Sequence, residues 1–106
     1  MADVRFRVDH DQLGILIAVM DHALQDRVRG EALNIVWSIV QALVIRLRKR
    51  HAERRLEYPL ILTVYQALAL RRMAIAGQEF MSDPRHVNEL RMVLMVLDPK
   101  LTAYTT

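Results

Sequence analysis

The sequence contains no cysteine and little glycine, proline or aromatic side chain. Without cysteine, disulfides, thiolate catalysis and cysteine-based metal sites are excluded. Only three glycines and three prolines occur in 106 residues, and 6% of the residues are aromatic. Low glycine and proline content disfavours both disordered chains and β-rich folds. Helices are therefore the expected elements.

A membrane span and a signal peptide are both unexpected. The apolar stretch at residues 33–45 is interrupted by Asn34, Ser38 and Gln41. As a helix, this stretch covers about 20 Å of the roughly 30 Å hydrocarbon core of a bilayer. Residues 1–12 carry three aspartates and no hydrophobic segment. Together with the missing cysteine, these features predict a soluble, cytoplasmic protein.

The apolar content exceeds what one small core needs. Hydrophobic residues make up 53% of the chain, whose length suits one domain covering residues 1–106. The surplus predicts a second buried surface, most simply in a homodimer. Six apolar side chains lie off the main helical stripes and motivate this prediction: Ile15, Val19, Leu62, Leu70, Met92 and Val96.

Residues 31–55 form the stretch around which the chain is organised. Its first part has the 3.6-residue period of a helix that faces a core. The apolar positions are Leu33, Val36, Ile39, Val40, Leu43, Val44 and Leu47. Its second part is basic, and its candidate binding residues are Arg46, Arg48, Lys49, Arg50, Arg54 and Arg55.

Two interpretations of this basic end remain open. Cations in the last turn of a helix complement the negative end of its dipole, each contributing roughly 0.3–1 kcal/mol. Alternatively, the cations bind an acidic partner such as nucleic acid, an anionic lipid surface or an acidic protein. Thirteen arginines and two lysines give a formal net charge of +3, which is compatible with either interpretation.

The pattern as a whole predicts an all-α, mostly helical fold: a four-helix, bundle-like domain with a long basic-ended second helix and one short N-terminal strand. The strand is expected at residues 4–8, and the helices at residues 11–25, 31–55, 59–76 and 84–97. Pro59 is expected in the first turn of the third helix and Gly77 just beyond its end. Asp83-Pro84 is expected to start the fourth helix and Asp98-Pro99 to end it.

The third helix is expected to bury one main stripe, and no internal repeat is visible. The stripe consists of Ile61, Val64, Tyr65, Leu68 and Ile75. Leu62, Leu70 and Met73 are expected on its flank. The tail LTAYTT is expected either to pair with the first strand or to fray.

No pattern of catalytic or cofactor-binding residues is present. The sequence lacks a phosphate-binding glycine loop, a zinc spacing and a nucleophile turn. His22 with Asp26, and His86 with Glu89, have helical spacing, but each pair supplies one carboxylate where two-metal bundles need about four. We therefore expect no enzyme activity, no cofactor, no metal site and no small-molecule substrate.

The start of the chain, VRFRVDHDQLGIL, resembles the ribbon-helix-helix family of DNA-binding proteins. The resemblance covers about the first third of the chain. It implies that the strand pairs with its mate in a dimer and that outward side chains read the major groove. Arg5 and Arg7 would then point outward, and Val4, Phe6 and Val8 would face the core.

Two functions are consistent with these observations. The first is a self-associating structural or adaptor module that acts through protein–protein contacts. The alternative is a nucleic-acid-binding protein, either ribbon-helix-helix-like or using the basic helix end to bind phosphates. In the second case, the binding residues would be Arg5 and Arg7 together with the basic end of the second helix.

Overall fold

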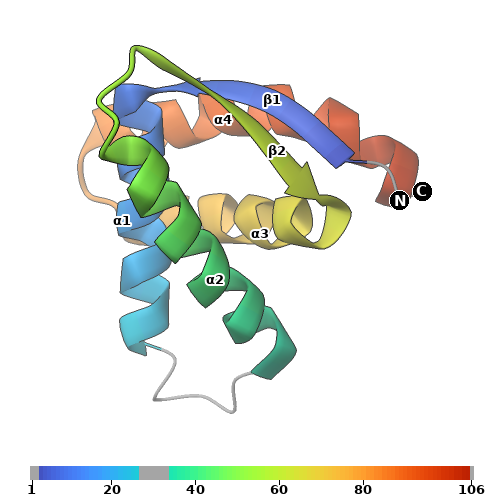
Figure 1. The fold of residues 1–106 in the computed structure, drawn as a ribbon. Helices are drawn as coiled ribbons and strands as arrows, with labels where there is room; N and C mark the ends of the chain where they lie inside the picture. Colours follow the sequence, from blue (N-terminus) through green and yellow to red (C-terminus); the bar gives the residue numbers. More distant parts are fainter. Residues whose placement is uncertain (1–2, 27–33, 106) are drawn as a thin grey trace.

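The computed structural model describes residues 3–26 and 34–105. The elements follow in the order β1 (Asp3–Asp9), α1 (His10–Asp26), α2 (Asn34–His51), β2 (Glu57–Thr63), α3 (Val64–Phe80) and α4 (Pro84–Thr105). The mostly helical class is confirmed, but the bundle arrangement is not. Beneath a two-stranded ribbon, α3 and α4 run across the view, α1 crosses their direction and α2 runs obliquely (Figure 1). No described helix is long and apolar enough to cross a membrane.

The first strand pairs within its own chain. β1 and β2 are antiparallel, with Phe6 opposite Leu60 and Arg5 opposite Ile61. The partner strand of β1 therefore comes from residues that were predicted to start the third helix. The expectation that β1 pairs with the same strand of a second copy is wrong. Both strands alternate between exposed and buried residues, which is the period of a sheet with one dry face.

Pro59 occupies a position in β2 where its missing N–H does not interrupt the hydrogen bonds of the sheet. The carbonyls of Pro59 and Ile61 accept hydrogen bonds from α2 on the side away from β1. Pro59 lies opposite Arg7, and the outward carbonyl of Pro59 identifies this as a non-hydrogen-bonded pair. In such a pair, the N–H and C=O groups of both residues point away from the partner strand. The missing N–H of Pro59 therefore costs no hydrogen bond to β1. Proline tolerates this position in a strand, although its sequence context favoured a helix start.

The chain consists of two β-α-α units of the same layout. Adding 54 to the residue numbers of β1 and α1 gives the bounds of β2 and α3, and α2 maps onto residues 88–105 of α4. Phe6 pairs with Leu60, which is its own equivalent, so an approximate twofold axis passes between them. This internal repeat was missed because only five equivalent pairs are identical: Gln12/Gln66, Leu16/Leu70, Asn34/Asn88, Leu43/Leu97 and Leu47/Leu101.

Each strand leads directly into a helix through the same hydrogen-bonded cap. Asp9 accepts the backbone N–H of Gln12, whose side chain accepts the N–H of Asp9. Thr63 and Gln66 exchange the same two bonds in the second unit. A reciprocal cap satisfies two backbone donors that a helix start would otherwise leave open. The sharp turn from strand to helix is thus stabilised locally in both units.

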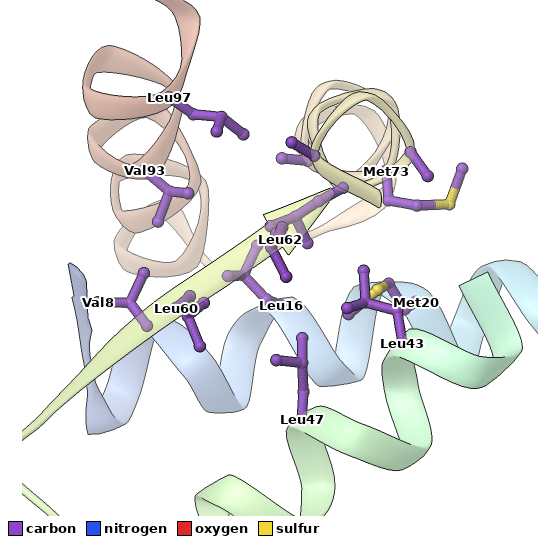
Figure 2. Close-up of a cluster of buried hydrophobic side chains, with 14 of the residues drawn as sticks. Val8, Leu16, Met20, Leu43, Leu47, Leu60, Leu62, Met73, Val93 and Leu97 are labelled. Carbon is purple, nitrogen blue, oxygen red and sulfur yellow. The ribbon is translucent and has the colours of Figure 1, made fainter. Parts of the chain in front are cut away.

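One core connects the ribbon with all four helices. Figure 2 shows buried side chains from both strands and every helix pointing into one space. Val40, Leu43 and Leu47 of α2 are fully buried, as their periodicity predicted, and Leu13, Leu16 and Met20 of α1 are fully buried as well. The side chains of Leu33 and Val36 lie outside the described set.

The third helix starts later than expected and faces the core with a different side. Its buried residues are Ala67, Ala69, Leu70, Met73, Ala74 and Gly77. Of the expected stripe, Ile61, Tyr65 and Ile75 are exposed, and the expected flank of Leu62, Leu70 and Met73 is buried. Small residues on the buried side let α3 approach its neighbours closely. The sequence prediction considered mainly large apolar residues and therefore overlooked this side of the helix.

Gly77 does not end α3, contrary to the prediction. The helix continues to Phe80, and a Cβ atom on Gly77 would lie 2.9 Å from both methyl carbons of Val19 and 3.1 Å from Leu90. The glycine is therefore needed for the close packing of α3 against α1 and α4.

The fourth helix starts as predicted but passes through Pro99. Asp83 accepts the backbone N–H of Arg85 at 2.9 Å, and this bond together with the Arg85 guanidinium lowers the pKa of Asp83 below its ordinary 3.8. The expected end at Asp98-Pro99 is wrong because Leu101 continues the buried stripe of Leu94 and Leu97. Burying a leucine stabilises by roughly 1.5–3 kcal/mol, which offsets much of the cost of a proline inside a helix.

Replacing Gly77 with alanine should destabilise the protein by about 1–2 kcal/mol. Overpacking costs about 1–3 kcal/mol, and the better helix propensity of alanine returns up to about 1 kcal/mol. Denaturant unfolding measures the change. In a Val19→Ala background the two nearest methyl groups are gone and the tight contact with Leu90 at 3.1 Å remains, so the same substitution should cost clearly less. Equal losses in both backgrounds would contradict this account of Gly77.

Candidate functional site

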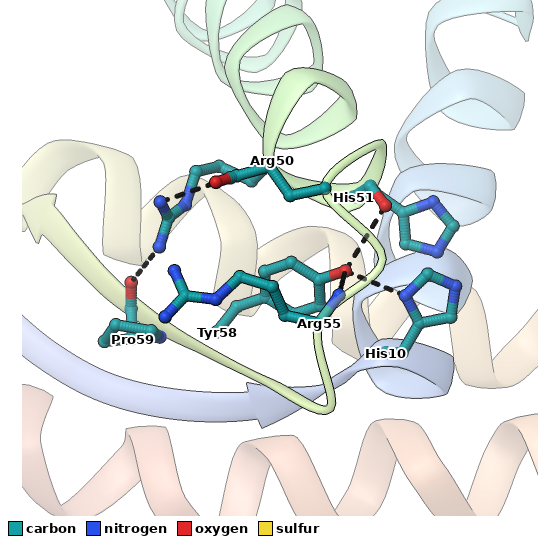
Figure 3. Close-up of polar contacts among 7 residues, drawn as sticks. His10, Arg50, His51, Arg55, Tyr58 and Pro59 are labelled. Carbon is teal, nitrogen blue, oxygen red and sulfur yellow. Dashed lines mark hydrogen bonds and ion pairs between the residues drawn. The ribbon is translucent and has the colours of Figure 1, made fainter.

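The basic end of α2 contacts the outer edge of the ribbon. Arg46 donates to the carbonyl of Ile61 at 2.8 Å, and Arg50 donates to the carbonyl of Pro59 at 3.3 Å. Arg46 and Arg50 are one helical turn apart, and the two carbonyls are two residues apart on the same side of β2. The arginines therefore occupy the outer edge of β2 (Figure 3 shows the Arg50 contact). An occupied edge is protected from pairing with another chain.

Other cations of this end have partners within the fold as well. Arg48 forms an ion pair with Asp21 of α1, and Arg50 lies 3.3 Å from Glu53. The first contact joins α1 to α2, and the second joins the last turn of α2 to the segment that follows it. Three of the six predicted binding residues of this end thus have intramolecular roles.

The remaining cations of this end are exposed. The side chains of Lys49, Arg54 and Arg55 have no hydrogen bond or ion pair with another residue that the structure describes. Arg54 has a positive φ of 53° where the chain leaves α2. The helix therefore ends at His51, and not at residue 55 as predicted.

Arg5 and Arg7 point outward from the ribbon, as predicted. Arg7 lies 3.6 Å from Glu57 on the neighbouring strand, and both side chains are largely exposed. Arg5 is exposed and lies opposite the exposed Ile61. On the outer face of the ribbon, β1 thus presents Arg5 and Arg7 between two exposed aspartates, and β2 presents Glu57, Pro59, Ile61 and Thr63.

A buried tyrosine joins the end of α2 to the start of α1. The Tyr58 hydroxyl lies 2.8 Å from Nδ1 of His10, accepts the backbone N–H of Arg55 at 2.9 Å, and lies 3.3 Å from the carbonyl of His51 (Figure 3). The rings of His10 and His51 stack with centroids 3.9 Å apart. No sequence spacing indicated this cluster, because its members come from three separate elements.

The stacked histidines border an open groove. His10 and Gly14 of α1 form one side, and His86 and Glu89 of α4 line it as well. Among the residues that the structure describes, no three histidine, aspartate or glutamate side chains are grouped so that they could hold a metal ion. His22 stacks on Phe80, and the side chain of Asp26, its expected partner, lies outside the described set.

The most distinctive exposed surface is apolar and lies along the α3–α4 contact. We call Ile75, Met92, Met95 and Val96 the seam patch; their exposed fractions are 43%, 46%, 76% and 44%. Two polar contacts join α3 to α4 at this seam. Arg71 binds Asp98 at 2.7 Å, and Arg91 donates to Gln78 at 3.3 Å.

Helical periodicity places Ile75 between the two polar contacts on α3, and Met95 between the same contacts on α4. Met92 and Val96 lie beside Met95 on the outer side of α4. The patch is therefore continuous across both helices.

The first β-α-α unit provides an internal comparison for this patch. The equivalents of its four residues are Asp21, Ser38, Gln41 and Ala42. Asp21 is paired with Arg48, and the other three are exposed. These positions thus carry polar or small side chains in the first unit and large apolar side chains in the second. The architecture alone does not require apolar residues at these positions.

A comparison of the chain with protein-family models, curated proteins and solved structures finds no match.

If Arg46 and Arg50 act structurally, changing both to glutamine should lower the free energy of unfolding by about 1–2 kcal/mol, since a typical hydrogen bond contributes about 0.5–1.5 kcal/mol. Lys49→Gln removes a charge from the same helix end without breaking a contact. It should change stability by less than about 0.5 kcal/mol. Chemical denaturation of the variants tests the difference, and equal effects would show that the contacts to β2 contribute nothing.

Proposed function

We propose that this protein is a non-enzymatic interaction module that binds another protein surface through the seam patch. The observation that carries the proposal is the internal comparison. At equivalent positions, the first unit has the polar residues Asp21, Ser38 and Gln41, and the second has the exposed apolar residues Ile75, Met92 and Met95. Contiguous exposed apolar side chains with a polar surround are typical of interaction sites.

The two methionines support this assignment. Methionine is flexible and polarisable, so it adapts to the shape of a partner and is common on binding surfaces. Met95 is the most exposed member of the patch. It contributes little to the core of this chain, so its apolar character is better explained by an external contact.

Self-association is one form of this proposal, but fewer of the residues expected on a dimer surface are available for it. Val19, Leu62 and Leu70 were expected on a dimer surface, but all three belong to the core of a single chain. Met92 and Val96 are exposed and belong to the seam patch. A homodimer would therefore use the outer side of α4.

Met95→Glu should abolish association while leaving the fold intact, because the side chain is mostly exposed and the substitution adds a charge at the centre of the patch. Gln41→Glu places the same charge at the equivalent position of the first unit and serves as the control. Sedimentation velocity over a range of concentrations, together with pull-down from cells that make the protein, measures association. The proposal fails if Met95→Glu retains every contact that Gln41→Glu retains.

A second candidate is nucleic-acid binding, favoured by the outward orientation of Arg5 and Arg7 on a ribbon whose other face is buried. The exposed Lys49, Arg54 and Arg55 would add contacts to phosphates. The remaining cations of α2 support this candidate less than the sequence suggested, because their contacts lie within the fold.

This candidate predicts a steep salt dependence. For duplex DNA, the logarithm of the affinity should fall with the logarithm of salt concentration, with a slope near −0.9 per contacted phosphate. Alanine at Arg5 and Arg7 should relax sequence preference, whereas alanine at Lys49, Arg54 and Arg55 should weaken all sequences alike. Fluorescence anisotropy with short duplexes measures both effects. An absence of binding at low salt would eliminate the candidate.

A further inference from the structure

The rim of the seam patch carries more positive than negative charge. Arg72 lies one helical turn before Ile75, Arg91 one turn before Met95, and Lys100 one turn after Val96; all three are exposed. Glu79, one turn after Ile75, is the exposed acid of the rim. The Arg71–Asp98 pair is internally neutral. Three cations against one acid leave an excess of two positive charges.

This rim disfavours a second copy as the occupant. Two patches related by a twofold axis would bring the same positively charged rims together, and like charges placed opposite each other oppose association. The patch is also small: four partly exposed side chains present on the order of a few hundred Å². A stable dimer buries about 800 Å² per partner.

We propose that the seam patch binds one amphipathic helix of a partner protein, with acidic residues flanking its apolar face. The inference rests on the proposed function above and specifies its partner. A single helix matches a narrow apolar strip along two packed helices, and it inserts apolar side chains spaced by one helical turn. Acidic flanks would face Arg72, Arg91 and Lys100, so the complementary charges add both specificity and a faster encounter.

The basic rim of the seam patch, like its apolar side chains, differs between the two units. The equivalents of Arg72, Arg91 and Lys100 in the first unit are Ala18, Trp37 and Arg46, and Arg46 donates to β2. Two of the three rim cations therefore have no counterpart. The apolar strip and its basic rim occur together in the second unit, as expected for one binding surface.

The test uses two labelled amphipathic peptides that share one leucine face and carry either glutamate or lysine on the polar face. Fluorescence anisotropy measures their binding to the full chain, to Met95→Glu and to Gln41→Glu. We expect the glutamate peptide to bind at least about tenfold more tightly than the lysine peptide. Met95→Glu should abolish this binding, Gln41→Glu should leave it unchanged, and added salt should weaken it.

The outcomes separate the partner chemistry from the proposed function. If both peptides bind equally and Met95→Glu abolishes both, the patch is an interaction site and the acidic-partner inference is wrong. A concentration-dependent dimer that Met95→Glu dissociates would make a second copy the occupant. Binding to anionic vesicles but to neither peptide, with the same sensitivity, would make a lipid surface the occupant. If Met95→Glu changes none of these measurements, both the inference and the proposed function fall.

Discussion

The pairing of β1 with β2 is the constraint on which the rest of the structure depends. Each strand buries three apolar side chains on one face, and neither strand can do so alone, because its edge would leave backbone groups unpaired. Their antiparallel register places Phe6 opposite its equivalent Leu60. Because each strand runs directly into a helix through a reciprocal cap, the ribbon also fixes where α1 and α3 begin. The two units then share one core.

The approximate twofold makes the differences between the units informative. At the outer edge of β2, two arginines of α2 satisfy the strand carbonyls; the equivalents in the second unit are Lys100 and Tyr104. At the seam, the first unit buries Ile17 and Val44 where the second forms the Arg71–Asp98 pair. Both units have an ion pair across the seam, Asp21–Arg48 in the first and Arg71–Asp98 in the second, but at different positions. The second unit has apolar side chains at the exposed positions where the first has polar or small ones. The proposed function is built on this difference, because a requirement of the fold would apply to both units.

The sequence predicted the elements whose signals are local. The alternation in β1, the described part of the buried stripe of α2, and the start of α4 at Asp83-Pro84 are confirmed. It failed where a distant contact overrides a local preference. Pro59 was predicted to start a helix, but it lies in β2, where its carbonyl accepts a hydrogen bond from α2. Gly77 was predicted to end a helix, but it allows α3 to pack closely against Val19. Pro99 was predicted to end α4, but the helix continues and buries Leu101. Of the predicted binding residues, Arg46 and Arg50 contact β2 and Arg48 contacts α1. Spacing cannot reveal these contacts.

The pairing of the ribbon within one chain can be tested directly by cross-linking, since the chain contains no cysteine. Arg5 and Ile61 form a pair directly opposite each other, at which Cα atoms lie about 4.5 Å apart, within the range that a disulfide bridges. The double variant Arg5→Cys/Ile61→Cys should oxidise rapidly to a bond within one chain, seen as a monomer on non-reducing electrophoresis. The out-of-register variant Arg7→Cys/Ile61→Cys, which leaves the cap at Thr63 intact, should oxidise much more slowly. Bonds formed between chains by the first variant, or equal rates for the two variants, would contradict the account.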